Sequence, residues 1–250
     1  MQVAARHLAA REVLRRAGAL VGPLRGRTRC VLSPWDDSCE ADLALEATLE
    51  NVVGKRWPER TDWVVRRRVE ERREVVLMVD TSMSMAGEKM ALASVAAAVL
   101  SLKLHRGDLS VVVFADDAVA VTRLGEEIDP EEIVERMLAR PCAGATDICA
   151  ALEVGHAELA RGRDPRRCGL LITDGMYTAG VDPCPVAATY GGLHVLLTSP
   201  KEAPSLTTWI TPGRMVGEAV ARAGNGGIVR VGGFDALPRR MLDIADSVLR

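Results

Sequence analysis

Several patterns that would assign this chain to a common class are absent from its sequence. None of its six cysteines belongs to a C-x-x-C pair, so neither a zinc ribbon nor a thioredoxin-type redox motif is indicated. A chain of 250 residues can fold without disulfide bonds, and we expect six reduced thiols. The start has no apolar core of signal-peptide length, and the longest apolar stretch, residues 90–104, is too short and too interrupted by serine to span a membrane. We therefore expect a soluble, cytoplasmic protein.

Motifs of the common catalytic folds are also missing. No G-x-x-x-x-G-K-[ST] loop occurs, so we do not expect the chain to be an ATPase itself, and no G-x-S-x-G nucleophile elbow occurs. The four histidines stand in helix-like or strand-like runs, which favours structural roles for them. The net charge of −2 gives no reason to expect a nucleic acid partner.

The charge is unevenly spread along the chain. Residues 1–29 hold seven Arg and one Glu, a balance of +6, whereas residues 74–250 hold 17 Lys and Arg and 23 Asp and Glu, a balance of −6. The basic arm is either a solvated helix face or a docking arm for an acidic partner. Residues 1–73 also contain three of the four tryptophans, which are favoured anchors at interfaces, so this region is a candidate for partner recruitment.

The hydrophobic pattern changes its period at about residue 74. Before it, we predict helices over residues 3–20 and 41–53, an irregular segment over residues 21–40, and an edge strand that leads into a buried one. After it, short apolar runs alternate with helical stretches, which indicates βαβ units and a sheet covered on both faces. We predict an N-terminal extension over residues 1–73 and, over residues 74–250, a doubly wound α/β domain with a mostly parallel sheet flanked by helices.

Small oxygen-bearing side chains collect at three junctions that lead into helices. The junctions are Asp80-Thr81-Ser82-Met83-Ser84, Gly144-Ala145-Thr146-Asp147 and Thr173-Asp174-Gly175. Taken singly, each has a plain explanation as a helix cap or a turn. Ligands of such sheets bind beyond the carboxyl ends of the strands, however, so we expect all three junctions to meet at one edge. Together they favour a binding site over three separate caps.

The chemistry of this set predicts a hard cation. Its members offer only hydroxyl and carboxylate oxygens, which suits Mg²⁺, Mn²⁺ or Ca²⁺ and disfavours Zn²⁺. The D-x-S-x-S spacing lets alternate residues of one turn point at a common centre. Because three of the five ligands are neutral hydroxyls, a metal here would stay electrophilic and would keep a coordination position for an outside carboxylate. The predicted metal ligands are Asp80, Ser82, Ser84, Thr146 and Asp174.

At these residues, and over about residues 74–232, the sequence resembles a von Willebrand factor A-type (VWA) domain with its metal-ion-dependent adhesion site (MIDAS). The resemblance implies a Rossmann-like fold in which Ser82, Ser84 and Thr146 are direct or near-direct ligands. It implies that Asp80 and Asp174 bind the metal directly or through water. Met83 is a departure, since many relatives have glycine there; it adds bulk beside the metal loop but removes no ligand.

The preceding segment, DLALEATLENVVGKRW, followed by basic residues and then the metal strand, resembles bacterial CoxE-like and chelatase-type proteins of the intracellular VWA branch. Those proteins act beside AAA+ ATPases of the MoxR or chelatase type. The resemblance therefore implies a non-catalytic adaptor with an AAA+ ATPase partner. Its bound Mg²⁺ would capture an Asp or Glu of the ATPase or of a client protein.

Two alternatives stay open at this stage. The first is a Mg²⁺-dependent phosphotransferase or phosphatase with Asp80 as nucleophile. Against it, Ser82 stands where such enzymes usually carry a second Asp, and we expect no lysine near Asp174 or Thr146 to stabilise a transferring phosphate. The second is a metal-free structural scaffold whose polar loops are only caps.

Overall fold

The structure, a computed structural model, describes residues 2–21, 28–36, 41–70, 72–198 and 212–232. The chain divides into two compact units, one made of Met1–Pro23 with Arg72–Arg250 and the other of Leu24–Glu71. The sequence also predicts a closing helix over residues 236–250, and this segment lies outside the described residues, as does Cys39. The other five cysteines form no disulfide bond in the described part of the chain.

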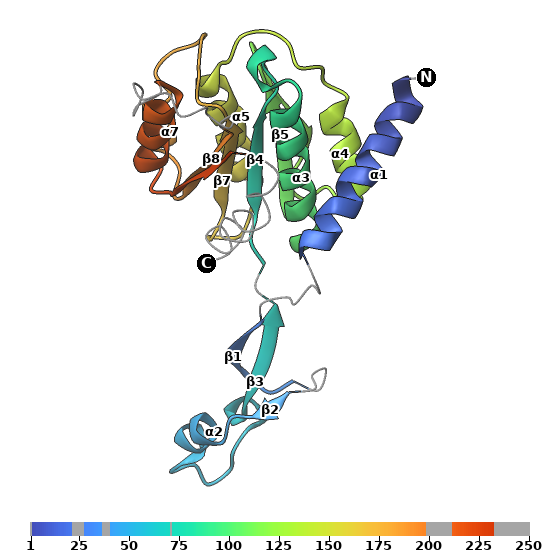
Figure 1. The fold of residues 1–250 in the computed structure, drawn as a ribbon. Helices are drawn as coiled ribbons and strands as arrows, with labels where there is room; N and C mark the ends of the chain where they lie inside the picture. The colour runs from blue at the N-terminus through green and yellow to red at the C-terminus, as the bar shows by residue number, and fades with distance from the viewer. Residues whose placement is uncertain (1, 22–27, 37–40, 71, 199–211, 233–250) are drawn as a thin grey trace. The chain divides into compact units, whose positions relative to one another are not determined.

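The larger unit is built on a six-stranded sheet with the order β6-β5-β4-β7-β8-β9 (Figure 1). All neighbouring pairs are parallel except β5 and β6, which form an antiparallel hairpin. The strands are β4 (Val75–Asp80), β5 (Leu109–Phe114), β6 (Ala118–Thr122), β7 (Cys168–Thr173), β8 (Leu193–Thr198) and β9 (Ile228–Val231). The prediction of a mostly parallel α/β sheet is confirmed.

Helices cover both faces of this sheet, in two hydrophobic clusters. One face carries α1 (Gln2–Val21), α3 (Glu88–Lys103) and α4 (Pro130–Leu138). The other carries α5 (Ile148–Arg161), α6 (Cys184–Ala187) and α7 (Pro212–Ala223). Strand β4 serves both: Leu77 and Val79 belong to the first cluster, Val76 and Met78 to the second. Successive side chains of a strand point to opposite faces, so a central strand between two layers must be apolar throughout.

Helix α1 belongs with the larger unit. Its Ala10 and Ala17 are fully buried among the residues of α3 and α4, and His7 contacts Glu135 of α4. Small side chains let two helices approach closely. This division differs from the predicted boundary at residue 73, because the first helix of that predicted extension packs on the α/β unit.

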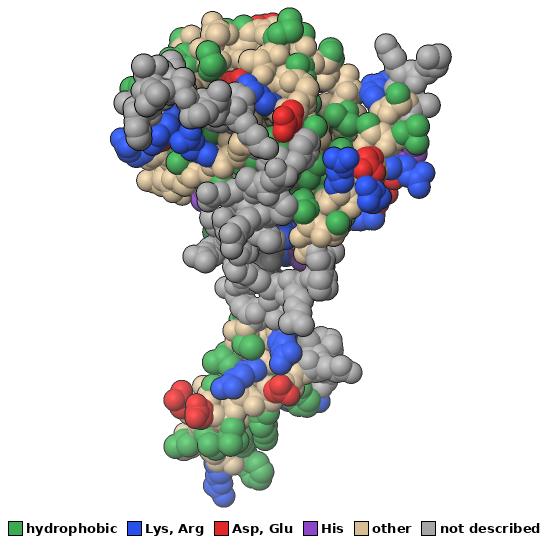
Figure 2. All heavy atoms as spheres, in the orientation of Figure 1, with side chains coloured by type: hydrophobic (Ala, Val, Ile, Leu, Met, Phe, Trp, Pro, Cys, Tyr) green, Lys and Arg blue, Asp and Glu red, His purple; other side chains and the backbone are tan. Residues whose placement is uncertain are grey.

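The smaller unit is an antiparallel sheet with the order β1-β3-β2, made of β1 (Thr28–Pro34), β2 (Asp42–Leu43) and β3 (Val64–Glu70), with α2 (Leu45–Val52) and the 3₁₀ helix η1 (Arg60–Asp62). Two expectations were wrong here. Part of the segment predicted to be irregular forms β1, and β3 is the central strand of this small sheet rather than an edge strand. Many hydrophobic side chains of the unit are exposed (Figure 2), including Leu45, Leu49, Val53 and Trp57.

Candidate metal centre

The candidate site lies at the edge of the sheet where β4 and β7 end. The two strands are adjacent and parallel, with Val79 opposite Ile172, so the residues that follow them leave the sheet side by side. Asp80 is the last residue of β4, and Asp174 follows the last residue of β7. This is the edge at which parallel α/β sheets bind their ligands.

The first loop is organised by Asp80, which is fully buried. Its Oδ1 accepts a hydrogen bond from the backbone N–H of Ser82 at 2.9 Å, and its Oδ2 accepts one from the hydroxyl of Thr173 at 2.6 Å. The second bond ties the end of β4 to the end of β7. The hydroxyl oxygens of Ser82 and Ser84 lie 3.2 Å apart, so two candidate ligands already share one small region.

The capping explanation does not hold for these serines. The N-cap of α3 is Gly87, and no side chain caps that helix. Ser82 precedes the short 3₁₀ helix η2 (Met83–Met85), again without a side-chain cap bond. The two hydroxyls are therefore not required for helix capping, although helix starts are where such residues usually serve that purpose.

The second loop is held against the first by backbone hydrogen bonds. The N–H of Ala143 donates to the carbonyl oxygen of Thr81 at 3.0 Å, and the N–H of Met83 donates to the carbonyl oxygen of Gly144 at 3.4 Å. Asp147 caps α5, because its Oδ1 accepts from the N–H of Ala150 at 3.0 Å. Its neighbour Thr146, which is 2 % exposed, therefore carries a hydroxyl that α5 does not need.

The third loop presents Asp174, whose side chain is only 5 % exposed. Its Oδ1 accepts from the N–H of Met176 at 3.1 Å, which is the turn expected from the sequence. Its Oδ2 pairs with the ammonium of Lys89 at 2.8 Å. The expectation that no lysine stands near Asp174 was wrong, because Lys89 reaches this carboxylate from the first turn of α3.

The two carboxylates of this edge favour a bound cation. Burial raises the pKa of Asp80, and the nearby Asp174 carboxylate adds to this effect, whereas hydrogen bonds from Ser82 and Thr173 oppose it. Two carboxylates held close together in a buried place destabilise each other's charge. The donor set contains only hydroxyl and carboxylate oxygens, so the residues present fit a hard divalent cation. All five predicted ligands belong to these three loops.

Two features near the centre were not predicted from the sequence: the bond from Thr173 to Asp80 and the position of Cys142. Thr173 was recognised as part of the third junction, but its bond to Asp80 depends on the order of the strands, which the sequence does not give. Cys142, in the second loop, has its pKa raised by burial and by the charge of Asp80, so its thiol lies within electrostatic reach of the centre. No spacing rule would have pointed to it.

The first and third loops carry exposed apolar side chains, Met83, Met176 and Tyr177, which together are called the apolar rim. Met83 is 68 % exposed, and Met176 and Tyr177 are exposed as well. Met85 is fully buried and accepts a hydrogen bond from the hydroxyl of Thr198, so it belongs to the core and not to this rim. Exposed methionine is adaptable and often occurs at surfaces that bind other proteins.

Comparisons with known proteins agree with this architecture. The chain is similar to BatB from Bacteroides thetaiotaomicron, with 19 % identity and a TM-score of 0.53 over 70 % of this chain and 99 % of that one. It is similar to a von Willebrand factor type A protein from Catenulispora acidiphila, with 16 % identity and a TM-score of 0.56 over 74 % of this chain and 45 % of that one. These likenesses show the fold.

A third similar structure is proximal thread matrix protein 1 from the mussel byssus, solved with a zinc-occupied MIDAS motif. Its identity is 16 % and its TM-score 0.57, over 71 % of this chain and 46 % of that one. No curated protein is similar enough in sequence to serve as a relative. In the described part of the chain, no helix has the length and apolarity needed to cross a lipid bilayer.

The family itself is given by a sequence model. The model described as "VWA domain containing CoxE-like protein" matches residues 37–186, which is more than half of the chain. The match begins at residue 37, within the smaller unit, covers all three junctions, and ends at residue 186, beyond Asp174. With a VWA-type sheet and a match of this extent, the chain belongs to the family of VWA domain containing CoxE-like proteins.

Proposed function

We propose that this protein is a non-catalytic adaptor that binds another protein through a metal ion. In this proposal Ser82, Ser84 and Thr146, with Asp80 and Asp174, hold one Mg²⁺, with Mn²⁺ or Ca²⁺ as substitutes. When bound, the ion would supply a Lewis-acidic position for a carboxylate. The observation that carries the proposal is the set of hydroxyls that no helix requires, gathered beside a buried carboxylate on loops bonded to one another.

Different residues of the chain would have different roles in binding the metal and the partner. Asp80 fixes the first loop through both of its oxygens, so the loop is preorganised before any ligand arrives. Ser84 is exposed and stands on the solvent side, where an outside oxygen can approach. The rim of Met83, Met176 and Tyr177 would contact the partner around the central carboxylate and set specificity.

The proposed class of partner is inferred from the family to which the chain belongs. CoxE-like proteins of the intracellular VWA branch act beside AAA+ ATPases, and we propose that the captured Asp or Glu belongs to a MoxR-type or chelatase-type ATPase or to its client. From the same resemblance we propose that the protein works in the cytoplasm. Because the mussel protein was solved with zinc in its MIDAS motif, Zn²⁺ should be included among the metals tested for binding. The oxygen donors of this chain nevertheless favour Mg²⁺ or Mn²⁺.

Affinity capture tests this proposal. Immobilised full-length protein is incubated with cell extract of its source in Mg²⁺, washed, and eluted with EDTA, and the eluate is identified by mass spectrometry. We expect an AAA+ ATPase or its client in the EDTA eluate of the wild type and its loss from Ser84→Ala. Ser101→Ala is the matched control, because its hydroxyl bonds only the carbonyl oxygen of Ala98 within α3. A partner that stays bound in EDTA and on Ser84→Ala would contradict the metal contact.

Two other functions are less well supported. A phosphotransferase would need Asp80 as a free nucleophile, yet this side chain is fully buried and both of its oxygens accept hydrogen bonds. A metal-free scaffold would need the serines as caps, a role they do not fill. Turnover of p-nitrophenyl phosphate in Mg²⁺, abolished by Asp80→Asn, would favour the first of these instead.

A further inference from the structure

A lysine occupies part of the proposed metal centre. The Nζ of Lys89 lies 2.8 Å from Oδ2 of Asp174, and the two side chains are 20 % and 5 % exposed. The other oxygen of Asp174 accepts from the N–H of Met176. Both oxygens of this predicted ligand therefore already have partners within the chain, one of them a full positive charge.

This pair is more sheltered than the exposed ion pairs on the surface of the described residues. Pairs such as Arg136 with Glu132 or Arg214 with Glu218 have side chains that are more than one-third exposed. Exposed pairs contribute little, because water and salt screen them. A pair that is mostly sheltered from water is screened less, and removing one partner leaves the other charge uncompensated.

Charge counting shows what the lysine does to a metal site. Asp80 and Asp174 together carry two negative charges, which would balance a divalent cation. The ammonium of Lys89 reduces the charge of the unloaded centre to −1 and raises that of the loaded centre to +1. A partner carboxylate would bring the loaded centre back to neutrality, in agreement with the capture mechanism.

We propose that Lys89 competes with the divalent cation for Asp174 and thereby lowers the metal affinity of the centre. This inference rests on the proposed function, because it takes the metal to bind at these residues. A cation that binds Asp174 directly must displace the ammonium, and one that binds through water must tolerate its repulsion. Either way the lysine opposes metal binding.

Calorimetric titration of Mn²⁺ into the full chain tests the inference. Lys89→Met keeps the length of the side chain and removes its charge, and Lys89→Gln keeps a hydrogen-bond donor for Asp174 without the charge. Lys103→Met, in the last turn of the same helix, is the matched control. Circular dichroism checks that each variant is folded.

We expect both Lys89 variants to bind Mn²⁺ at least about tenfold more tightly than wild type, a difference of about 1.4 kcal/mol, and Lys103→Met to match wild type. Binding by the Lys89 variants with none detectable in wild type would support the inference in its strongest form. Equal or weaker binding by both Lys89 variants, with wild type binding normally, would overturn the inference alone. No binding by any of the proteins would overturn the proposed metal centre together with it.

A second measurement does not depend on the metal. In EDTA, the ion pair should stabilise the fold, so Lys89→Met should lower the melting temperature. The double variant Lys89→Met with Asp174→Asn should recover part of that loss, since no carboxylate is then left unpaired. Additive effects of the two substitutions would show that the pair is not formed and would overturn the inference.

Discussion

Gly175 directly follows Asp174 and offers a quantitative test of how the third loop is built. Its φ of +78° lies in the left-handed region, and a Cβ at this position would stand 2.1 Å from the carbonyl oxygen of Gly213 in α7. A Cβ at Gly213 would in turn stand 2.3 Å from the carbonyl oxygen of Asp174. The loop and the start of α7 therefore touch backbone to backbone, where no side chain can move aside.

The cost of Gly175→Ala has two parts that a control can separate. The left-handed conformation costs a residue with a Cβ about 1–2 kcal/mol. Overpacking against a backbone that cannot rotate away adds about 1–3 kcal/mol. Gly125 has a φ of +85° but nothing within 4 Å of its ideal Cβ, so Gly125→Ala carries only the first part. We expect Gly175→Ala to be less stable than Gly125→Ala by at least about 1 kcal/mol.

Urea unfolding of both variants in EDTA, followed by circular dichroism, gives the two free energies. Since Asp174 must shift with Gly175, the same variant should also bind Mn²⁺ more weakly than Gly125→Ala does. Equal loss of stability in the two variants, within about 0.5 kcal/mol, would refute the close approach of the loop to α7.

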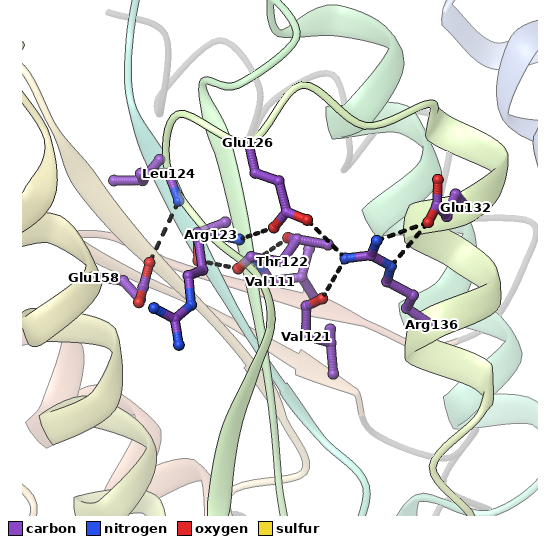
Figure 3. Close-up of polar contacts among 10 residues, drawn as sticks. Val111, Val121, Thr122, Arg123, Leu124, Glu126, Glu132, Arg136 and Glu158 are labelled. Atoms are coloured by element: carbon purple, nitrogen blue, oxygen red, sulfur yellow. Dashed lines mark hydrogen bonds and ion pairs between the residues drawn. The ribbon is translucent and has the colours of Figure 1, made fainter.

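Three more predictions concern charge and burial. Burial raises the pKa of Asp80 above its usual 3.8, so in EDTA the folded chain binds the carboxyl proton of Asp80 more tightly than the unfolded chain does. The stabilisation from this proton is complete below pH 3.8 and is lost as the pH rises through the raised pKa of the folded state. Asp80→Asn should therefore flatten the pH dependence of the unfolding free energy, measured by urea unfolding in EDTA. Arg136→Met should cost about 1 kcal/mol, since it removes the bonds to Glu126, Glu132 and the carbonyl oxygen of Val121 (Figure 3). Arg136 lowers the pKa of Glu126, so the cost should be greatest above pH 4.5 and should become smaller as the pH falls, leaving the bond to Val121, which urea unfolding at several pH values would reveal. Burial raises the pKa of Cys168 to about 11, so iodoacetamide at pH 8 should label the exposed Cys30 first and Cys168 only after unfolding, as peptide mass spectrometry can establish.

The sequence was sufficient for the sheet and for the location of the loops. Buried apolar runs separated by helices have few arrangements other than parallel strands between two helical layers, so Asp80 and Asp174 were expected at one edge. In the structure β4 pairs directly with β7, so Asp80 and Asp174 lie on neighbouring strand ends. The pattern of the runs alone does not give the order of the strands.

The features that were missed depend on contacts between distant segments. Strand β1 lies in a stretch rich in glycine, proline and arginine, and it exists because residues about 35 positions later, in β3, pair with it. Lys89 was missed because a lysine in the first turn of a helix usually points to water, and its contact with Asp174 joins residues 85 positions apart. Local propensity carries no information on either contact.

Titration of Mg²⁺ into wild type and Thr146→Ala tests the metal centre most directly. Thr146 comes from the second loop, and Asp147 rather than Thr146 caps α5, so its hydroxyl has no capping role to lose. Thr189→Ala is the control, because its exposed hydroxyl bonds only the carbonyl oxygen of Val186. We predict one Mg²⁺ per chain for wild type and Thr189→Ala and at least about tenfold weaker binding for Thr146→Ala. Equal binding by all three proteins would contradict a metal centre built from these loops.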